Sequence, residues 1–491
     1  MLQDLKVDLP SRPPEAEVCI VGAGAAGISL ALKLAQLGVS VLLLEGGADH
    51  FTAESTDVYA GTCESPLSDR YLTGSRLRFL GGTTNHWLGY CLRLDPIDFE
   101  ARSWVADSGW PFDHTELDRF YLDAAPLCAI EAPIGIGSPL TEGSDVLRKP
   151  LAVEATRFGE LYAEALAASD RVQLLLNANL VRIHANADGT AVDHLAVAAP
   201  SGERLQVKAE HVVLAAGGLE NARLLLVSND VQKDGLGNGH DLVGRYFMDH
   251  PVFPVAAVVV GQGGPLLENP QPREEGLRLS DARQRELELL NCSLSFAAVP
   301  QVADTRRQLL EQSSWQRLAG YLESDELGGT SWWKKLYDPW PSGLHATEFT
   351  VRPEAPPLRD SRLRLGEGKD AYGNPRSHLQ WKLSGDIVRT VRKTMEEIAL
   401  ELGRRGYGRL FLDDEALERG VLSPGYHHMG TTRMHDDPRQ GVVDRHCKVH
   451  GLENLYVAGS SVFPTGGVAN PTYTLVALAL RLAEHLKATK L

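Results

Sequence analysis

The chain has few of the residues that build metal centres and disulfide frameworks. Its 491 residues include only six cysteines, scattered without a Cys-x-x-Cys pair. Neither a zinc site nor a disulfide scaffold is indicated, and we expect no metal. Long apolar runs are also missing, so no membrane-spanning segment is expected. The first residues, "MLQDLKVDLPSRPPEAEV", carry acids and prolines where a secretory signal would have a basic start and an apolar run, and we therefore expect a cytoplasmic protein.

Positive charge is scarce as well. The 49 lysines and arginines are outnumbered by 64 aspartates and glutamates, which gives a net charge of −15. Because nucleic acids and anionic membranes are bound by basic surfaces, we expect neither as a partner. The content of 43% hydrophobic and 23% charged residues is typical of a soluble globular protein. The length predicts two or three domains, and the oligomeric state stays open, a homo-oligomer included.

A nucleotide-binding pattern occupies the first part of the chain. In "AEVCIVGAGAAGISLALKLAQLGVSVLLLEGG", from Ala16, an apolar run leads into Gly22-x-Gly24-x-x-Gly27, a helical pattern follows, and a second apolar run ends at Glu45. Strand, turn, helix, strand and acid in this order predict a dinucleotide site. The three glycines would permit a tight turn, backbone approach to a pyrophosphate and close helix-to-strand packing. The helix N-terminus offers N–H groups, and Glu45 can accept hydrogen bonds from both ribose hydroxyls.

Two later segments favour FAD over NAD as the dinucleotide. Residues 211–226, "HVVLAAGGLENARLLL", and 454–464, "NLYVAGSSVFP", each predict a buried strand followed by a turn of small residues. Three separated strand-to-turn junctions around one dinucleotide imply a domain assembled from the start, middle and end of the chain. That arrangement suits the elongated FAD better.

Four further segments carry a family resemblance through the order in which they follow one another along the chain. They are "LGGTTNHW" at 80–87, "LVGRYFMDHP" at 242–251, "SRLRLGEGKDAYGNPRSHLQWKLSGDI" at 361–387 and the tail from His427. Together they make the chain similar, nearly end to end, to the glucose-methanol-choline (GMC) oxidoreductases, nearest in motifs to the pyranose oxidase-like branch. The resemblance implies an α/β fold with a doubly wound, Rossmann-like FAD-binding domain. It also implies a substrate domain with a largely antiparallel sheet and helices.

The resemblance also implies how the chain is divided. We expect a discontinuous FAD-binding domain of residues 14–95, 172–250 and 440–491, and a substrate-binding domain of residues 96–171 and 251–439. For the tryptophan-rich stretch "GGTSWWKKLYDPW" at 328–340, a place at the substrate entrance and simple surface packing stay open alternatives.

Two segments alternate in the manner of hairpin strands. Residues 172–210 do so with turns at Asp188-Gly189 and Ser201-Gly202. Residues 346–385 do likewise, with a turn at Tyr372-Gly373-Asn374. Both are expected to form hairpins.

The tail predicts the catalytic pair. In "GYHHMGTTRM", at 425–434, adjacent residues of an extended segment point to opposite sides, so at most one of His427 and His428 faces a given ligand. GMC enzymes carry a histidine in a His-x-x-Gly-Thr-like setting and, some forty residues on, a second histidine or an asparagine. The resemblance places these roles on His427 and Asn470. His428 would then be structural, with a register shifted by one residue as the alternative.

The chemistry of alcohol oxidation suits this pair. The hydroxyl loses a proton, which an imidazole can accept, and a hydride passes to flavin N5, which is the work of the cofactor. Asn470 cannot act as a base, but its amide can hold the alcohol oxygen. Since Pro471 and an apolar run follow, Asn470 also sits where a helix N-cap belongs.

The resemblance supplies further expectations about the cofactor. In covalently flavinylated relatives a histidine at the place of His86 is bonded to the flavin, so a covalent link and a simple contact stay open. Leu88 stands where the sugar oxidases carry a hydroxyl residue, which puts oxygen reactivity and substrate detail in doubt. The predicted cofactor-binding residues are Gly22, Gly24, Ala25, Ala26, Gly27, Glu45, Gly46, Gly82, Thr83, Asn85, His86, Ala216, Gly217, Gly459, Ser460, Pro471 and Thr472.

The leading expectation is an FAD-dependent enzyme that oxidises an alcohol group of a sugar, glycoside or polyol to a carbonyl. The electron acceptor would be oxygen or another molecule, so the sequence leaves oxidase and dehydrogenase open. A redox-silent lyase on the same fold and a dehydrogenase of a non-sugar alcohol are the alternatives. An NAD(P)H-using flavin reductase or hydroxylase would need a second nucleotide fingerprint, and the chain has one convincing instance.

Overall fold

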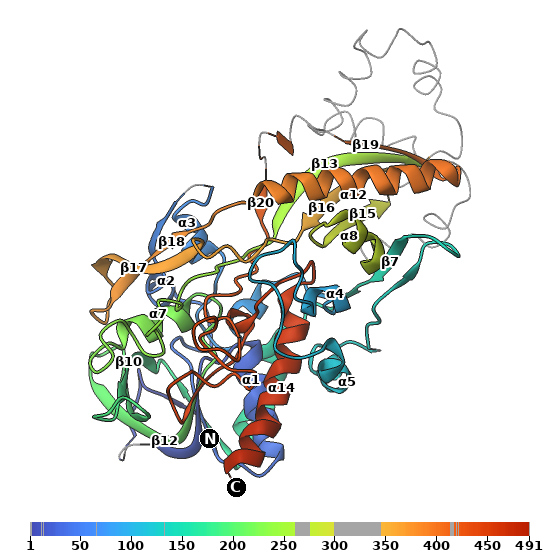
Figure 1. The fold of residues 1–491 in the computed structure, drawn as a ribbon. Helices are drawn as coiled ribbons and strands as arrows, with labels where there is room; N and C mark the ends of the chain where they lie inside the picture. The colour runs from blue at the N-terminus through green and yellow to red at the C-terminus, as the bar shows by residue number, and fades with distance from the viewer. Residues whose placement is uncertain are drawn as a thin grey trace.

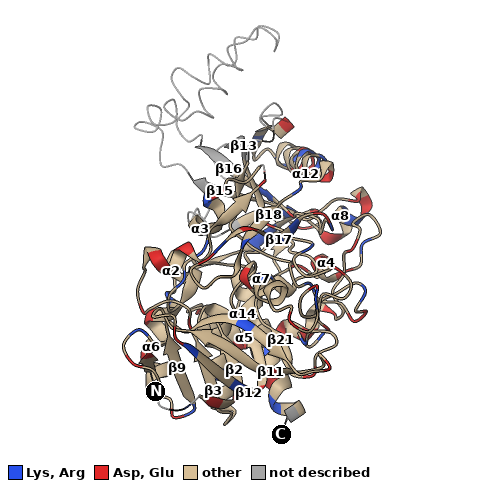
Figure 2. Ribbon diagram, turned by 90° about the vertical axis from the view of Figure 1, so that its left-hand side faces the viewer, with Lys and Arg blue, Asp and Glu red and all other residues tan. Residues whose placement is uncertain are grey.

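The computed structural model describes residues 2–10, 12, 14–64, 66–131, 133–260, 275–298, 345–412, 417, 418, 420 and 422–490. The tryptophan-rich stretch 328–340 lies outside these residues. Both termini lie in one part of the molecule, and a second part holds a sheet with one long helix along it (Figure 1). Lysine, arginine, aspartate and glutamate residues are spread over both parts (Figure 2).

A mainly parallel sheet forms the centre of the first part. Its strands run in the order β1-β9-β3-β2-β12, and β21 adds to β12 in parallel. The bounds are β1 Leu2–Asp4, β9 Val172–Leu176, β3 Val41–Leu44, β2 Glu15–Val21, β12 Arg204–Leu214 and β21 Leu455–Val457. All four residues of β3 are buried aliphatics, as expected of a parallel strand covered on both faces. β3 lies on one side of β2 and β12 on the other. At such a point, where the strand order changes direction, α/β sheets bind ligands at the carboxyl ends of the strands, here those of β2 and β12.

Helices cover this sheet. The helix α1 (Ala25–Gln36) packs against α14 (Pro471–Lys490), which also packs against α5 (Asp118–Leu127), and α6 (Phe158–Ala168) contacts β9 and α1. α1 and α14 lie side by side in the ribbon view (Figure 1). Two helices of the predicted substrate segment 96–171 thus pack on elements of the predicted FAD-binding domain, and the domain bounds stay a prediction.

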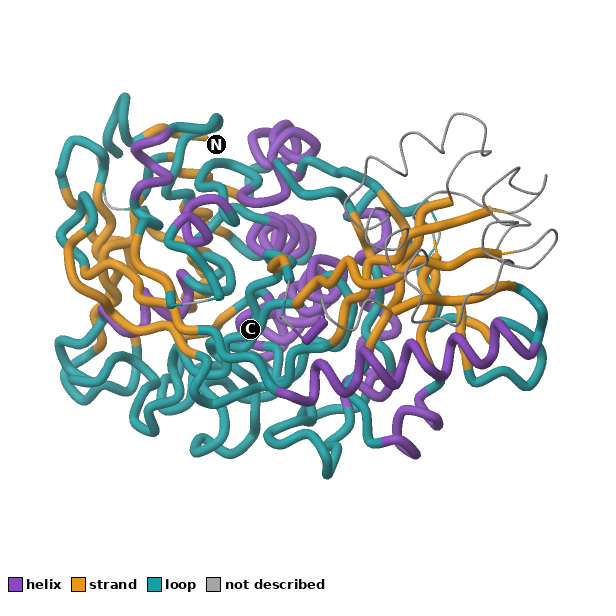
Figure 3. The backbone as a smooth tube through the Cα atoms, turned by 90° about the horizontal axis from the view of Figure 1, so that it is seen from above, coloured by secondary structure: helices purple, strands orange, loops and turns teal. Residues whose placement is uncertain are grey.

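An antiparallel sheet forms the second part, in the order β19-β13-β16-β15-β14-β7-β6, with β20 paired to β13. The bounds are β19 Gly408–Leu412, β13 Pro251–Val260, β16 His345–Pro353, β15 Cys292–Ala298, β14 Glu275–Leu279, β7 Val146–Pro150, β6 Ser138–Pro139 and β20 Ser423–Pro424. The helix α12 (Gly385–Arg404) lies along this sheet. From above, strands gather at the two ends of the molecule with helices between them (Figure 3). The predicted fold class is confirmed.

The sequence of α12 explains its place. Ile387, Val391, Met395, Ile398 and Leu402 are buried, and their spacing of three or four residues puts them on one face of a helix. This stripe shares a hydrophobic core with aliphatic side chains of the antiparallel sheet. Charged residues on the other face keep the helix at the surface.

Smaller elements complete the fold. In the described residues the remaining α-helices are α2 Ala53–Asp57, α3 Arg70–Gly74, α4 Pro96–Phe99, α7 Glu220–Val227 and α8 Asp281–Leu287. The remaining strands are β4 Gly61–Cys63, β5 Tyr90–Cys91, β8 Ala152–Val153, β10 Asn179–Ala185, β11 Val192–Ala198, β17 Arg362–Lys369 and β18 Pro375–Gln380. β17, β18 and β4 form a three-stranded sheet, and β5 pairs with β8.

The hairpin predictions are confirmed in part. β10, β11 and β12 form an antiparallel meander with Gly189 and Gly202 at positive φ in its turns, and β17 and β18 form a hairpin around Gly373. The prediction is wrong for β9, which pairs in parallel with β3 and β1, and for β16, which joins the other sheet. Alternation indicates which face of a strand is buried, but it does not specify the neighbouring strand.

Candidate active site

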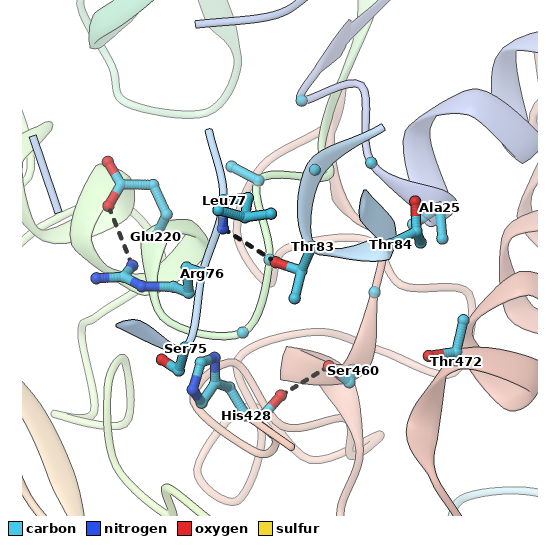
Figure 4. Close-up of a pocket in the computed structure, with 18 of the residues that line it drawn as sticks. Ala25, Ser75, Arg76, Leu77, Thr83, Thr84, Glu220, His428, Ser460 and Thr472 are labelled. Carbon is cyan, nitrogen blue, oxygen red and sulfur yellow. Dashed lines mark hydrogen bonds and ion pairs between the residues drawn. The ribbon is translucent and has the colours of Figure 1, made fainter. Parts of the chain in front are cut away.

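A cavity of about 430 Å³ opens at the carboxyl ends of β2 and β12. Its walls come from the turn before α1, the loop around residues 75–90, the turn after β12, and the tail segments around 425–428 and 459–472. Figure 4 shows Ala25, Thr83, Ser460 and Thr472 around the cavity, from three of these segments. Segments distant in sequence thus meet at one site.

The three fingerprint glycines have different neighbours. Gly22 adopts φ +106°, and a Cβ there would lie 2.5 Å from the carbonyl oxygen of Ala215. A Cβ on Gly27 would lie 1.8 Å from the carbonyl oxygen of Gly22, so this glycine lets the helix pack on the turn. A Cβ on Gly24 would meet no described atom within 4 Å. Gly24 therefore exposes its backbone to the cavity.

The start of α1 is suited to an anion. Gly24 is its N-cap, and no side chain caps the helix by a hydrogen bond. The first helical residues, Ala25, Ala26 and Gly27, have side chains too small to cover the free N–H groups. Uncovered N–H groups and the positive end of the helix dipole bind phosphate well. The cradle left by Gly24 and this helix end fit the pyrophosphate of FAD.

Glu45 is held rigidly at the end of β3. Its side chain is buried, and its Oε2 and Oε1 atoms accept hydrogen bonds from the backbone N–H groups of Ala23, at 3.0 Å, and Gly47, at 2.9 Å. A carboxylate oxygen has a second lone pair, so the group can still accept hydroxyl donors. This geometry fits a ribose beside the glycine turn.

Most predicted cofactor-binding residues line the cavity. They are Gly22, Gly24, Ala25, Ala26, Glu45, Gly46, Gly82, Thr83, His86, Ala216, Gly217, Gly459, Ser460, Pro471 and Thr472. Gly27 and Asn85 are not among its lining residues. The Nδ2 atom of Asn85 donates to the carbonyl oxygens of Leu80, at 2.9 Å, and Gly82, at 3.0 Å. Asn85 therefore braces its own loop and does not face the cavity.

His427 is bonded on both sides of its ring. Its Nε2 lies 3.0 Å from Nδ2 of Asn470, and its Nδ1 lies 2.8 Å from Nδ1 of His250. Both predicted catalytic residues line the cavity. The structure therefore brings the two together across 43 positions of sequence.

The electrostatics around His427 favour a neutral imidazole. Burial is the main cause that holds its pKa well below the ordinary histidine value, and the charges of His250, Arg352 and His428 act in the same direction. A neutral ring at physiological pH has one nitrogen lone pair free to accept a proton.

His428 lies in a different environment. Its ring packs edge-on to Tyr71 at a centroid distance of 5.2 Å and is tilted toward Phe247 at 6.2 Å. Within the described residues its Nε2 has no hydrogen-bond partner. Burial, followed by the charge of Arg76, lowers its pKa to about 3. Both histidines line the cavity, but only His427 contacts Asn470.

Asn470 uses its amide in the site. The helix α14 begins at Pro471, as the proline predicted. The Oδ1 atom of Asn470, however, accepts from Nη1 of Arg352, while its Nδ2 faces His427. The expected cap on the first turn of α14 is thus replaced by these two side-chain contacts.

Asp249 was missed by sequence reasoning although it holds the segment that contains His427. Its Oδ1 accepts from the backbone N–H groups of His427, at 2.8 Å, and His250, at 2.7 Å. Its Oδ2 accepts from the N–H of Tyr426, at 3.1 Å, and the hydroxyl of Tyr71, at 2.6 Å. Burial raises the pKa of this carboxyl to about 6. The pair Asp-His within "LVGRYFMDHP" was the available signal.

Arg352 was missed too. It comes from β16 of the antiparallel sheet, lines the cavity, and donates from Nη1 to Asn470 and to the carbonyl oxygen of Val468, at 3.3 Å. Burial lowers its pKa, while the nearby Asp249 and Tyr90 act against that shift. No local motif around it indicated this role.

A buried ion group forms the wall near His428. Nη1 of Arg76 lies 3.9 Å from Oε2 of Glu220, and its guanidinium carbon lies 4.0 Å from the ring centre of Tyr59. Figure 4 shows Arg76 and Glu220 facing each other beside Ser75 and His428. Arg76 lies four residues before the "LGGTTNHW" motif. The motif does not include it, so the motif did not predict its place in the cavity wall.

Two protein-family models match the chain. The model described as GMC oxidoreductase matches residues 357–479, and the model described as FAD dependent oxidoreductase matches residues 17–233. The chain belongs to the GMC oxidoreductases. As a GMC oxidoreductase it is an FAD-dependent enzyme acting on CH–OH donors, which confirms the predicted family, cofactor and enzyme class.

Several curated proteins are similar to this GMC chain. The 2-methyl-1,2-propanediol dehydrogenase of Mycolicibacterium austroafricanum is 25% identical over 96% of this chain and 95% of its own length. The fructose dehydrogenase large subunit of Gluconobacter japonicus is 23% identical over 96% of this chain and 97% of its own length. The pyranose 2-oxidase of Tricholoma matsutake is 43% identical over 26% of this chain and 22% of its own length.

Solved structures support the fold. A formate oxidase superposes with a TM-score of 0.58 and 18% identity over 98% of this chain and 99% of its own. No helix in the described part of this GMC oxidoreductase has both the length and the apolar character needed to cross a bilayer. Among the same residues, no group of three or more metal-ligating side chains comes together.

Proposed function

We propose that this GMC oxidoreductase oxidises a CH–OH group of a sugar, glycoside or polyol to a carbonyl, with His427 as the base and Asn470 as the residue that positions the hydroxyl oxygen. The contact of 3.0 Å between Asn470 Nδ2 and His427 Nε2, at the wall of the dinucleotide cavity, carries the proposal. A donor and a base side by side can bind one hydroxyl group through its oxygen and its proton together.

The two residues divide the work by their chemistry. The hydroxyl donates to His427 Nε2, and its oxygen accepts from Asn470 Nδ2 in place of the direct contact between the residues. The lowered pKa keeps His427 unprotonated at neutral pH, ready to accept the proton. FAD, when bound, supplies the acceptor for the hydride. Arg352 adds a positive charge that stabilises negative charge developing on the substrate oxygen.

The substrate class rests on the relatives. Two of the similar proteins, by name, act on fructose and on pyranoses, which favours a sugar, and a third acts on a small diol, which favours a polyol. The diol dehydrogenase matches nearly the full chain, so a small non-sugar alcohol is the second candidate. The same names include oxidases and dehydrogenases, and the acceptor is either oxygen or another molecule.

Anaerobic titration of the purified holoenzyme tests the reaction. Sugars, glycosides and small diols are added in turn while the oxidised flavin absorbance is followed, and air is then admitted. We expect bleaching by at least one sugar, glycoside or polyol, with return of the absorbance in air if the enzyme is an oxidase. Absence of bleaching by every alcohol would favour the redox-silent lyase.

The link between His86 and FAD needs its own experiment. His86 lines the cavity, and burial followed by the charge of Arg157 lowers its pKa, so the ring is neutral and nucleophilic near pH 7. If the covalent link exists, acid-denatured protein keeps flavin fluorescence on its gel band, and His86→Ala abolishes it. Complete release of free FAD from the wild type would leave His86 as a contact residue.

A further inference from the structure

The catalytic pair belongs to a longer chain of hydrogen bonds. Arg352 Nη1 donates to Asn470 Oδ1, and Asn470 Nδ2 faces His427 Nε2 at 3.0 Å. His427 Nδ1 faces His250 Nδ1 at 2.8 Å, and His250 Nε2 lies 2.7 Å from the carbonyl oxygen of Gly467. The chain begins at a group that can only donate and ends at a group that can only accept.

The arginine end fixes the orientation of the amide. A guanidinium has no acceptor, so the oxygen of Asn470 must face Arg352 and its NH2 group must face His427. The reverse orientation would set two donors against each other. Asn470 therefore donates to His427 Nε2, and this nitrogen must carry a lone pair.

The carbonyl end leads to the same assignment. Because the oxygen of Gly467 only accepts, His250 Nε2 carries a hydrogen. His250 is fully buried, and burial lowers its pKa to about 3, so the ring is neutral and its Nδ1 is an acceptor. The partner nitrogen, His427 Nδ1, must then carry the hydrogen of that bond. Both ends give His427 the same tautomer.

The surroundings hold this arrangement in place. Asp249 Oδ1 accepts the backbone N–H of both histidines, and the two rings meet edge-on at 5.0 Å and 79°. A Cβ on Gly467, whose φ is +52°, would lie 2.1 Å from Oδ2 of Asp98, so the loop that presents the carbonyl is packed tightly. The backbone of both histidines and the carbonyl of Gly467 are thus held in place.

We propose that His250 is a positioning residue that fixes His427 as its Nδ1–H tautomer and so leaves the lone pair of Nε2 toward Asn470 and the substrate. The role of a tautomer-setting partner follows from the two inequivalent ring nitrogens of histidine. The inference rests on the proposed function insofar as it gives His427 the part of the base. The tautomer itself can be measured independently of any reaction.

The experiment uses holoenzyme containing ¹⁵N-labelled histidine. Ring nitrogens with and without a hydrogen differ widely in NMR chemical shift, and the His427 signals are those lost in His427→Ala. In the wild type we expect a hydrogen on Nδ1 of His427 and none on Nε2. A wild-type His427 with its hydrogen on Nε2 would overturn the proposal, and this result does not depend on the folding of any His250 variant.

Two substitutions then separate the hydrogen bond from the space that His250 fills. His250→Asn offers a side-chain carbonyl close to the place of Nδ1 and should keep the tautomer. His250→Leu has similar bulk without an acceptor, so only the Arg352–Asn470 end then favours the Nδ1–H form of His427, and the Nε2–H form should appear in part. His446→Leu, in the ring pair of His446 and His485, is the control for removal of a histidine elsewhere. Retention of the pure Nδ1–H form in His250→Leu would overturn the proposal.

Kinetics add a second readout. The anaerobic rate of flavin reduction by the best alcohol should fall roughly 10²-fold in His250→Leu, the lower end of the contribution of a positioned proton acceptor, and should recover largely in His250→Asn. If no alcohol reduces the flavin while the NMR result holds, the proposed function fails and the tautomer assignment stands. If alcohols reduce the flavin equally fast in His250→Leu, the positioning role fails alone.

Discussion

The two walls of the cavity are built in different ways. The dinucleotide wall consists of backbone: Gly24 leaves an open cradle, and the turn and α1 close on each other at Gly22 and Gly27. The catalytic wall consists of buried polar side chains, where Asp249 alone accepts four hydrogen bonds. A wall of backbone is specified by a short stretch of sequence, whereas a wall of side chains needs residues from several distant elements.

A buried ion network fastens the segment around α4 to the antiparallel sheet. Glu354 lies two residues after Arg352 and forms an ion pair with Arg102. The Nη2 atom of Arg102 lies 2.6 Å from Oε1 of Glu354, and both side chains are fully buried. Nearby, Lys149 bonds to Asp95 at 2.6 Å. Buried ion pairs add little net stability, but they enforce geometry because an unpaired buried charge is costly. The sheet can thereby hold Arg352 against Asn470.

The largest expected effect is chemical and confined to the catalytic wall. His427→Ala should slow anaerobic flavin reduction by about 10²–10⁴-fold, or roughly 3–5 kcal/mol of barrier, because it removes the proton acceptor. FAD content should stay at the wild-type level, since the dinucleotide wall is untouched. His428→Ala is the matched control and should cost far less. The opposite ranking in stopped-flow measurements would mean that the adjacent histidine is the base.

In the dinucleotide wall we expect a steric effect, from a substitution at Gly27. In Gly27→Ala the added Cβ would lie 1.8 Å from a backbone oxygen, so the turn must shift, at about 1–3 kcal/mol. We expect a lower melting temperature and a lower flavin-to-protein absorbance ratio.

Gly24→Ala sharpens that test, since its Cβ points into open space. It should lower flavin content while the apoprotein melts as the wild-type apoprotein does. Equal melting of the apoproteins of both variants would contradict the separate roles of the two glycines.

Asp249→Asn should loosen the catalytic wall from behind. One carboxylate oxygen becomes an NH2 group facing donors, and an unsatisfied buried donor costs about 1–3 kcal/mol. We expect slower flavin reduction and lower thermal stability with unchanged flavin content. Asp193→Asn, on the exposed surface of β11, is the control, and a reduction rate equal to that of the wild type in Asp249→Asn would argue against the clamp.

The dinucleotide wall could be predicted from the sequence better than the catalytic wall, because it is formed by a short stretch of chain. The span from Gly22 to Glu45 is local, so order and spacing alone predicted its strand, turn, helix and acid. His250 comes beside His427 through the pairing of β13 with β20 and the bridge between Met248 and Met429, whereas Arg352 arrives with β16, which pairs with β13. Alternation patterns do not specify these strand partners. Asn85 shows the limit of a motif, since this residue hydrogen-bonds within its own loop and is not among the residues that line the cavity.

The smallest expected effect is a shift in pH dependence. His427 must be unprotonated to accept a proton, so activity is lost as pH falls through its pKa. Burial holds that pKa well below the ordinary value, and the charge of Arg352 contributes in the same direction. The kcat/KM of the wild type should therefore stay flat on acidification through the ordinary histidine range.

Removal of the guanidinium in Arg352→Met should raise the pKa of His427 and move the acid limb of the profile to higher pH. The same change frees the amide of Asn470 to turn, so kcat/KM should also fall on the plateau. Arg362→Met, which removes a partly buried guanidinium paired with Asp241, should leave the profile in place. An acid limb unmoved in Arg352→Met would show that the antiparallel sheet contributes geometry to the catalytic wall but not charge. Burial, with the two neighbouring histidines, would then account for the low pKa of His427.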